Sequence, residues 1–152
     1  MMRIIKDYGK IGSVLVVLGW QWTRLSKCTD NGEIFYILKV INPFSRLPVI
    51  ATKISLDMAN KLITVLSTDK DTTEIDGGPK KEFSPILGFS GEIIKDYGKI
   101  GDTTRLFRLS KKGKEFFALT TENSNGLAFI SIKITQDMAE KLASAFRDNS
   151  GV

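Results

Sequence analysis

The sequence predicts an α+β protein made of two diverged copies of one unit, in which three or four strands precede a helix. The first observation is a repeat of identical letters, because IIKDYGKIG stands at residues 4–12 and again at 93–101. Two further blocks return in the same order: RLSK at 24–27 and 108–111, then KISLDMANKL at 53–62 and KITQDMAEKL at 133–142. Three matched blocks in one order indicate a tandem duplication.

The repeats divide the chain into three segments. The expected boundaries are a first repeat at 2–67 with its helix at 56–67, a linker at 68–90, and a second repeat at 91–148 with its helix at 136–147. The linker is acidic and rich in turn residues, with Asp76-Gly77-Gly78-Pro79 as its strongest turn signal. Residues 1–68 hold nine basic and four acidic side chains, whereas 69–90 hold three and five. The positive charge therefore belongs to the repeats.

Alternating and β-branched segments predict the strands of each copy. If the repeated IIKDYGKIG segment is a regular strand, Lys6, Tyr8 and Lys10 share one face and Ile11 lies on the other. The turns between strands are expected around the Asn-Gly and Lys-Gly pairs at 31–32 and 112–113. The remaining strands are expected at 14–27, 33–41 and 48–54 in the first copy, and at 104–110, 115–121 and 127–134 in the second.

The apolar stretch at 13–22 resembles the apolar region of a signal peptide. It is too short to span a bilayer, and no small-residue cleavage site follows it. The segment just before it also recurs inside the chain, where no export signal can stand. We therefore interpret 13–22 as a buried strand and predict an intracellular protein, cytoplasmic or nucleoid-associated, that is not secreted and has no membrane partner.

Each copy closes with an amphipathic helix. Ser55 and Thr135 are suitable N-caps, and Asp57 and Asp137 then favour the positive start of each helix. One copy alone leaves a helix face and a sheet face uncovered, so the two copies are expected to pair as an intramolecular pseudo-dimer with curved antiparallel sheets and packed helices. Neither half is expected to fold alone, and whether pseudo-dimers pair again as a homodimer stays open.

Composition argues against an enzyme. The chain has no histidine and a single cysteine, Cys28, which removes histidine-assisted nucleophiles, common metal ligands and an internal disulfide. No Gly-rich phosphate loop or cofactor motif is present. We expect no catalytic residues, no metal and no cofactor. The net charge of +5 and the isoelectric point near 9.3 permit a polyanionic partner.

The order of elements in the second copy resembles a known class of repeat. A strand is followed by the basic, Gly-centred turn and aromatic pair of SKKGKEFFALT, then by a strand ending in KIT and an amphipathic helix. This order is similar to the single-stranded nucleic-acid-binding repeats of the PUR-alpha family and of the transcription coactivator positive cofactor four, and in outline to Whirly proteins. The resemblance implies paired repeats whose hairpins hold the strand, here through Lys111, Lys112, Lys114 and Phe116, with Lys27 and Phe35 as counterparts. The first copy departs at its acidic turn, CTDNGE.

The predicted binding residues are basic and aromatic. Lysines neutralise phosphates, and a tyrosine between them can stack on any base. The alternative for the Lys-x-Tyr-x-Lys segments is an ordinary solvated strand face. The candidates outside the resemblance are Lys6, Tyr8, Lys10, Arg24, Lys53, Lys95, Tyr97, Lys99, Arg108 and Lys133.

Two candidate groups have structural alternatives. Trp20, Trp22 and Arg24 share one strand face, which fits either a stacking surface or core packing under the helix. Lys53 and Lys133 precede the helices and fit either phosphate contacts or solvated strand ends.

The function predicted from these residues is binding of single-stranded nucleic acid, DNA rather than RNA, with little dependence on sequence. The alternative is a protein-interaction module that contacts an acidic partner. Salt-dependent binding to a short oligonucleotide distinguishes the two.

Overall fold

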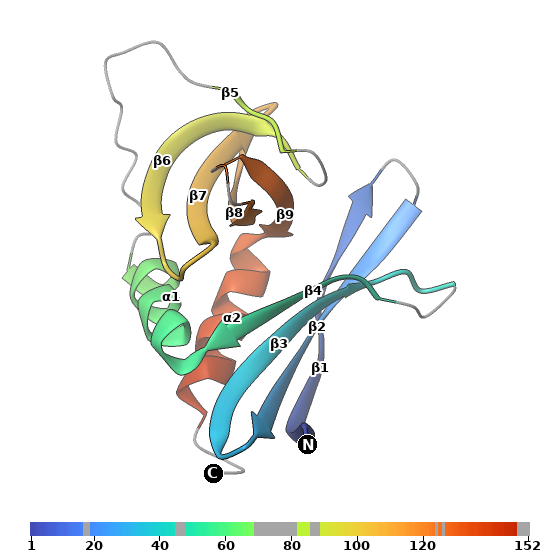
Figure 1. Cartoon of the computed structure of the whole chain (residues 1–152). Helices are drawn as coiled ribbons and strands as arrows, with labels where there is room; N and C mark the ends of the chain where they lie inside the picture. The colour runs from blue at the N-terminus through green and yellow to red at the C-terminus, as the bar shows by residue number, and fades with distance from the viewer. Residues whose placement is uncertain are drawn as a thin grey trace. The chain divides into compact units, whose positions relative to one another are not determined.

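The computed structural model describes residues 1–16, 19–44, 48–68, 82–85, 89–123, 125 and 127–148, with the backbone alone at 14–16, 19, 20, 48, 49, 67, 68 and 128. Over these residues the protein is α+β, with a four-stranded and a five-stranded antiparallel sheet and two helices (Figure 1). The predicted turn at Asp76–Pro79 and the side chain of Trp20 lie outside the described residues.

The chain divides into two compact units. Unit 1 is formed by Met1–Thr68 together with Glu140–Val152, and unit 2 by Asp69–Ala139. The boundary falls inside the last helix, so the second repeat expected at 91–148 is not a compact unit by itself. The tail of that repeat belongs to the unit of the first.

Unit 1 contains a sheet of four strands in sequence order. These are β1 (Arg3–Val16), β2 (Gly19–Asp30), β3 (Glu33–Ile41) and β4 (Pro48–Ser55). The prediction of one buried strand across 13–22 is wrong, because β1 continues to Val16 and pairs there with Gly19 of β2. The first copy has five more residues than the second between the IIKDYGKIG and RLSK blocks, whose starts are 20 and 15 residues apart. Those residues lengthen both arms of the hairpin.

Unit 2 contains the strands β5 (Glu82–Phe83), β6 (Gly91–Lys99), β7 (Thr104–Lys111), β8 (Lys114–Glu122) and β9 (Ala128–Ile134). Figure 1 shows the strong curvature of β6 and β7. The expected linker is in part a strand, since β5 pairs with β6. Phe83 of β5 is buried with Phe107 and Phe116, and Phe89 packs against this cluster. The segment before β6 therefore supplies core side chains.

Both predicted Gly turns are confirmed as two-residue hairpin loops. The backbone angle φ is positive at both loop positions, 52° and 82° at Asn31 and Gly32 and 53° and 78° at Lys112 and Gly113. Two positive values are the signature of a type I′ turn, which suits the twist of a β-hairpin. The register then places Asp30 opposite Glu33 in unit 1 and Lys111 opposite Lys114 in unit 2.

The repeated segment adopts the same bulged conformation in β1 and β6. Gly9 and Gly98 have φ of 73° and 82°, and the amide of each donates to the carboxylate two residues earlier at 2.8 Å. Bulges interrupt the register beside both glycines. Because a bulge adds a residue to one strand, regular alternation fails here. Ile11 lies on the same side of β1 as Tyr8, which corrects the predicted opposite placement.

Two helices complete the described part of the chain, α1 (Leu56–Thr68) and α2 (Gln136–Arg147). The predicted N-caps are confirmed, since Ser55 Oγ accepts from the Met58 amide at 3.2 Å and Thr135 Oγ1 from the Met138 amide at 3.4 Å. The later part of α2 packs within unit 1, where the ring of Phe146 lies 4.8 Å from that of Tyr36.

Candidate nucleic-acid interface

Four predicted binding residues lie on one face of the unit 2 sheet. Lys114 and Phe116 are two residues apart on β8, so their side chains share a face. Lys111 lies opposite Lys114, and Lys133 of β9 lies opposite Ala118, the next residue of β8 on that face. The hairpin and β9 thus bring three lysines to one side of the sheet. Below, Lys111, Lys114 and Lys133 are called the lysine cluster.

Lys133 lies over two phenylalanine rings. Its Nζ is 4.7 Å from the centre of the Phe116 ring and 5.1 Å from that of Phe89. The two rings meet edge to face with centroids 6.3 Å apart. A lysine over such faces gains cation–π attraction while its aliphatic stem covers apolar surface.

The lysine cluster is electrostatically unfavourable in the unbound protein. Burial, followed by the neighbouring charges of Lys114 and Lys111, lowers the pKa of Lys133. Like charges opposite each other on adjacent strands are also destabilising, and Lys111 and Lys114 stand in that relation. No carboxylate in the described ranges forms an ion pair with these three lysines. The cluster is therefore suited to an external anion.

An exposed aromatic ring lies along the same strand. Phe129 is 41% exposed and lies on β9 four residues before Lys133. The pairing of β9 with β8 shifts register at this residue, so the face it lies on does not follow from alternation. An exposed ring at this place offers a flat surface on which a base can stack. Sequence reasoning missed Phe129, because its exposure depends on a bulge that alternation does not reveal.

The first copy has the opposite charges at the matched positions. Lys53 lies over the Phe35 ring at 4.4 Å, as Lys133 lies over Phe116. Its Nζ, however, pairs with Glu33 Oε1 at 3.1 Å, and Asp30 stands opposite Glu33. Lys53 of unit 1 is therefore neutralised by a carboxylate, whereas its counterpart in unit 2, Lys133, has two further lysines beside it.

Several predicted contacts are not open to a ligand. Phe35 and Phe116 are each 4% exposed and serve as core rings beneath a lysine, so the stacking proposed for them does not fit their placement. Lys27 and Arg108 are 2% and 7% exposed. Lys27 donates to the backbone oxygen of Asp148 at 3.4 Å, and Arg108 pairs with Glu115 at 3.1 Å. Both cationic groups therefore already have partners within the folded protein.

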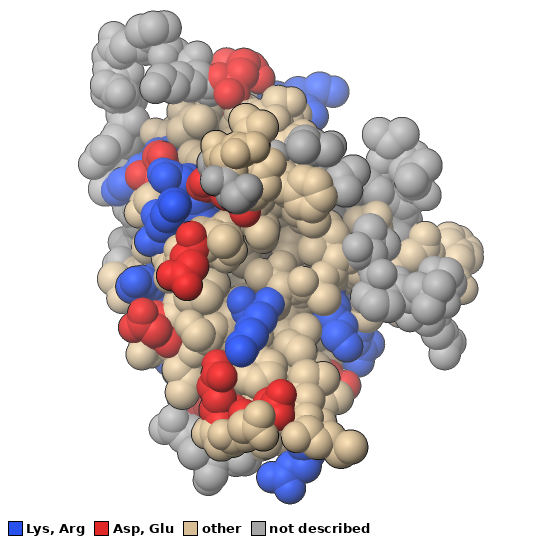
Figure 2. Space-filling model, viewed as in Figure 1, with Lys and Arg blue, Asp and Glu red and all other residues tan. Residues whose placement is uncertain are grey.

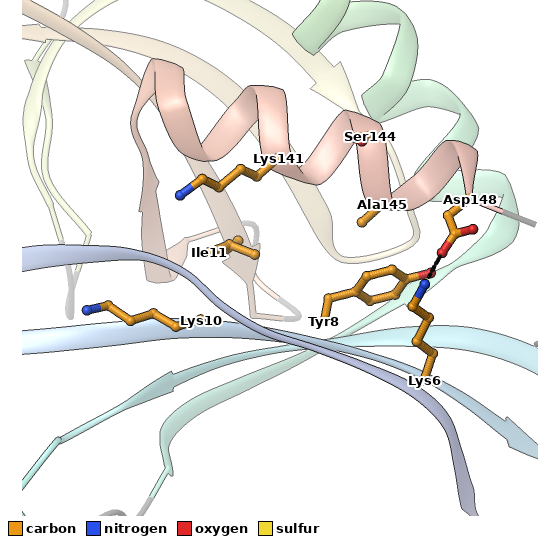
Figure 3. Close-up of a pocket in the computed structure, with 8 residues that line it drawn as sticks. All are labelled: Lys6, Tyr8, Lys10, Ile11, Lys141, Ser144, Ala145 and Asp148. Atoms are coloured by element: carbon orange, nitrogen blue, oxygen red, sulfur yellow. Dashed lines mark hydrogen bonds and ion pairs between the residues drawn. The ribbon is translucent and has the colours of Figure 1, made fainter. Parts of the chain in front are cut away.

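The repeated Lys-x-Tyr pair of unit 1 is bound to the end of α2. Lys6 Nζ and the Tyr8 hydroxyl both donate to Asp148 Oδ2, at 2.7 and 3.1 Å (Figure 3). Burial and then this hydrogen bond raise the pKa of Tyr8, which keeps its hydroxyl protonated. This pair is therefore part of a folded contact rather than an open stacking platform. Asp148 was not among the predicted residues, since nothing in its local sequence marks it.

In unit 2 the matched lysine again lies over the tyrosine. The distance from Nζ to the ring centre is 5.1 Å for Lys95 and Tyr97, as it is for Lys6 and Tyr8. The Tyr97 ring is also 6.2 Å from that of buried Phe117. Tyr97 is therefore half-buried against the core. Lys99 is exposed and lies opposite Arg105, which bonds Asp96 at 2.9 Å and Glu122 at 2.7 Å.

The structure places two residues of the predicted tryptophan face, Trp22 and Arg24. Trp22 is half-buried, with Lys10 Nζ 4.8 Å from its ring centre. Arg24 lies opposite Lys10 in the register and approaches Asp7 at 3.6 Å. Trp22 is neither a closed core residue nor a bare surface ring.

Positive and negative charges are mixed on the face of the molecule that Figure 2 shows. On the face in Figure 2, basic and acidic side chains lie among one another over the parts coloured by charge. The described residues hold no group of three or more acidic or cysteine side chains placed to bind a metal. None of the helices in the described ranges is long and apolar enough to cross a membrane.

No protein-family model matches the chain, and a search of curated proteins finds no match.

Proposed function

We propose that the chain binds single-stranded nucleic acid, DNA in preference to RNA, with little dependence on sequence and without catalysis. The observation that carries the proposal is the lysine cluster of unit 2, which holds three cations together although burial, and then the charges of Lys114 and Lys111, lower the pKa of Lys133. Phosphate groups relieve the repulsion between these charges and release counterions on binding. Such a role implies an intracellular protein, in the cytoplasm or at the nucleoid.

The exposed ring of Phe129 supports a single strand over a duplex. Bases of a single strand are free to stack, and every base has a face that an aromatic ring can cover. In a duplex those faces are already stacked. Lysines at the hairpin and an aromatic ring further along the sheet thus match a backbone with unpaired bases.

We also propose that the two repeats form an intramolecular pseudo-dimer, as in the PUR-alpha, positive cofactor four and Whirly proteins that the sequence resembles. Support comes from the matched order of strands and helix in both copies. Further support is that unit 1 includes Glu140–Val152 from the second repeat. The second copy thus contributes a helix segment to the unit of the first, which fits a pairing of the two copies.

The test is a competition titration with oligo-dT, oligo-U and duplex DNA at several salt concentrations. We expect oligo-dT to bind more tightly than oligo-U, and both more tightly than the duplex, with affinity falling as salt rises. Equal or tighter binding of the duplex contradicts the proposal.

Replacing Phe129 separates stacking from charge. Phe129→Ala is expected to weaken oligo-dT binding roughly tenfold, since stacking contributes about 1–3 kcal/mol per base. The salt slope should stay the same because no phosphate contact is lost. The melting temperature should also hold, since the ring is 41% exposed. Phe129→Tyr is the control and should bind like the parent. A Phe129→Ala protein with full affinity removes the ring from the site.

The second candidate function is a module that binds an acidic protein segment. It is favoured by the burial of Phe116, which leaves lysines rather than that ring at the hairpin of unit 2. Carboxylates pair with lysines without any need for stacking. A polyglutamate peptide that displaces oligo-dT at equal charge concentration favours this second function.

A further inference from the structure

Unit 1 has a pocket between β1 and the later part of α2. Its volume is about 510 Å³, within the usual range of roughly 300–1,000 Å³ for small-molecule sites. Figure 3 shows the side chains that line it: Lys6, Tyr8, Lys10, Ile11, Lys141, Ser144, Ala145 and Asp148. All of them belong to unit 1.

The lining of the pocket is positively charged. Lys6, Lys10 and Lys141 stand against one carboxylate, that of Asp148. Lys6 is paired with Asp148 at 2.7 Å, whereas neither Lys10 nor Lys141 forms an ion pair within the described part of the chain. The ammonium groups of these two lysines lie at the other end of the pocket from Lys6 and Asp148 (Figure 3), and that of Lys10 is 4.8 Å from the Trp22 ring centre. Neither is neutralised by a carboxylate among the described residues, so both attract an anionic ligand. The ring of Tyr8 provides apolar surface in the pocket, whereas Ile11, which also lines it, is buried.

The Asp148 carboxylate occupies a place that an anionic group of a ligand can take. Its Oδ2 accepts hydrogen bonds from the Lys6 ammonium and from the Tyr8 hydroxyl, so two donors converge on one charged oxygen. An ammonium and a hydroxyl at these distances are equally suited to a phosphate oxygen. The Asp148 side chain is 28% exposed and lies just beyond the last residue of α2, where a ligand can reach it.

We propose that this pocket binds a nucleoside monophosphate group and that Asp148 is its internal competitor. The phosphate replaces the Asp148 carboxylate at Lys6 and Tyr8, and the charges of Lys10 and Lys141 at the other end of the pocket add to its attraction. The nucleoside lies against the ring of Tyr8. The group belongs either to a free nucleotide or to one residue of a bound strand. The pocket shares no residue with the lysine cluster, so this proposal can hold even if the function proposed above is wrong.

The test is calorimetric titration of AMP, with inorganic phosphate as a second probe. Asp148→Asn keeps the size of the side chain but removes its charge. It is expected to bind AMP roughly tenfold or more tightly than the parent, because the competitor no longer holds the donors. Lys141→Glu, on the exposed side of the helix, is expected to abolish AMP binding in the parent chain.

AMP binding to Asp148→Asn that is no tighter than to the parent overturns the proposal. If Asp148→Asn does not fold, AMP binding that is absent from the parent or unaltered by Lys141→Glu overturns it. Equal affinity for phosphate and AMP overturns the nucleoside part.

A variant with Lys111→Asp and Lys114→Glu distinguishes a free nucleotide from a residue of a bound strand, because these changes in unit 2 leave the pocket of unit 1 intact. Displacement of AMP by oligo-dT there indicates a residue of a strand, and no displacement indicates a free nucleotide. Loss of oligo-dT binding at the lysine cluster does not alter AMP binding, so the two proposals fail separately.

Discussion

Replacing Lys111 with Asp and Lys114 with Glu should weaken oligo-dT binding on the order of 100-fold near 0.1 M salt. These are the residues of the first copy at the matched positions, Asp30 and Glu33. By analogy with the pair of Lys53 and Glu33, the new Glu also neutralises Lys133, so three phosphate contacts are lost. Each contact adds about 0.7 to the salt slope for a single strand, or roughly fivefold in affinity at that salt, and the slope should fall by about 2.

A charge exchange between the two hairpins provides the matched control. Adding Asp30→Lys and Glu33→Lys to the double variant restores the net charge of +5. It also gives Lys53, over the Phe35 ring, the cationic neighbours that Lys133 has in the parent. If the local arrangement binds the strand, the fourfold variant should regain much of the affinity. An unaltered salt slope in the double variant removes the hairpin from the site.

Phe146→Ala should lower the free energy of unfolding of unit 1 by about 3–5 kcal/mol, the usual range for truncating a buried phenylalanine. The ring is 8% exposed and meets Tyr36 at 4.8 Å. Both tryptophans, Trp20 and Trp22, are in β2 of unit 1, so their fluorescence during denaturant unfolding reports on this unit.

Ser144→Ala is the control, since Ser144 lies exposed on the same helix and its replacement should change stability little. A Phe146→Ala protein whose tryptophan unfolding midpoint equals that of the parent shows that the sheet of unit 1 does not depend on α2.

The fold was predictable where local chemistry decides it. Asn31-Gly32 and Lys112-Gly113 specify type I′ turns by themselves, and Ser55 and Thr135 specify helix starts. The bulge at Gly9 was not predicted, because a strand face is assigned by counting alternate residues and a bulge adds one. A glycine after an aspartate and a tyrosine is the signal that regular alternation misses.

The candidate site was predictable in charge but not in exposure. The lysines of the second hairpin lie at the surface as the sequence indicates. Phe116 does not, because it is buried with Phe83 and packed against Phe89, two residues of a segment predicted to be a linker. Partners that far apart in sequence cannot be found from alternation. For the same reason Asp148 was missed, since it meets Lys6 across 142 residues.

The division of α2 between the two units also bears on how the chain folds during synthesis. The ribosome releases β1 to β4 first, yet unit 1 includes Glu140–Val152 and remains incomplete until that segment has been translated. The unit of the first sheet is therefore complete only after translation has passed the residues from Glu140 onward. Contacts of such high sequence separation slow folding and prolong the exposure of strand edges. Unit 2, which is continuous in sequence from Asp69 to Ala139, can complete itself earlier than the half that precedes it.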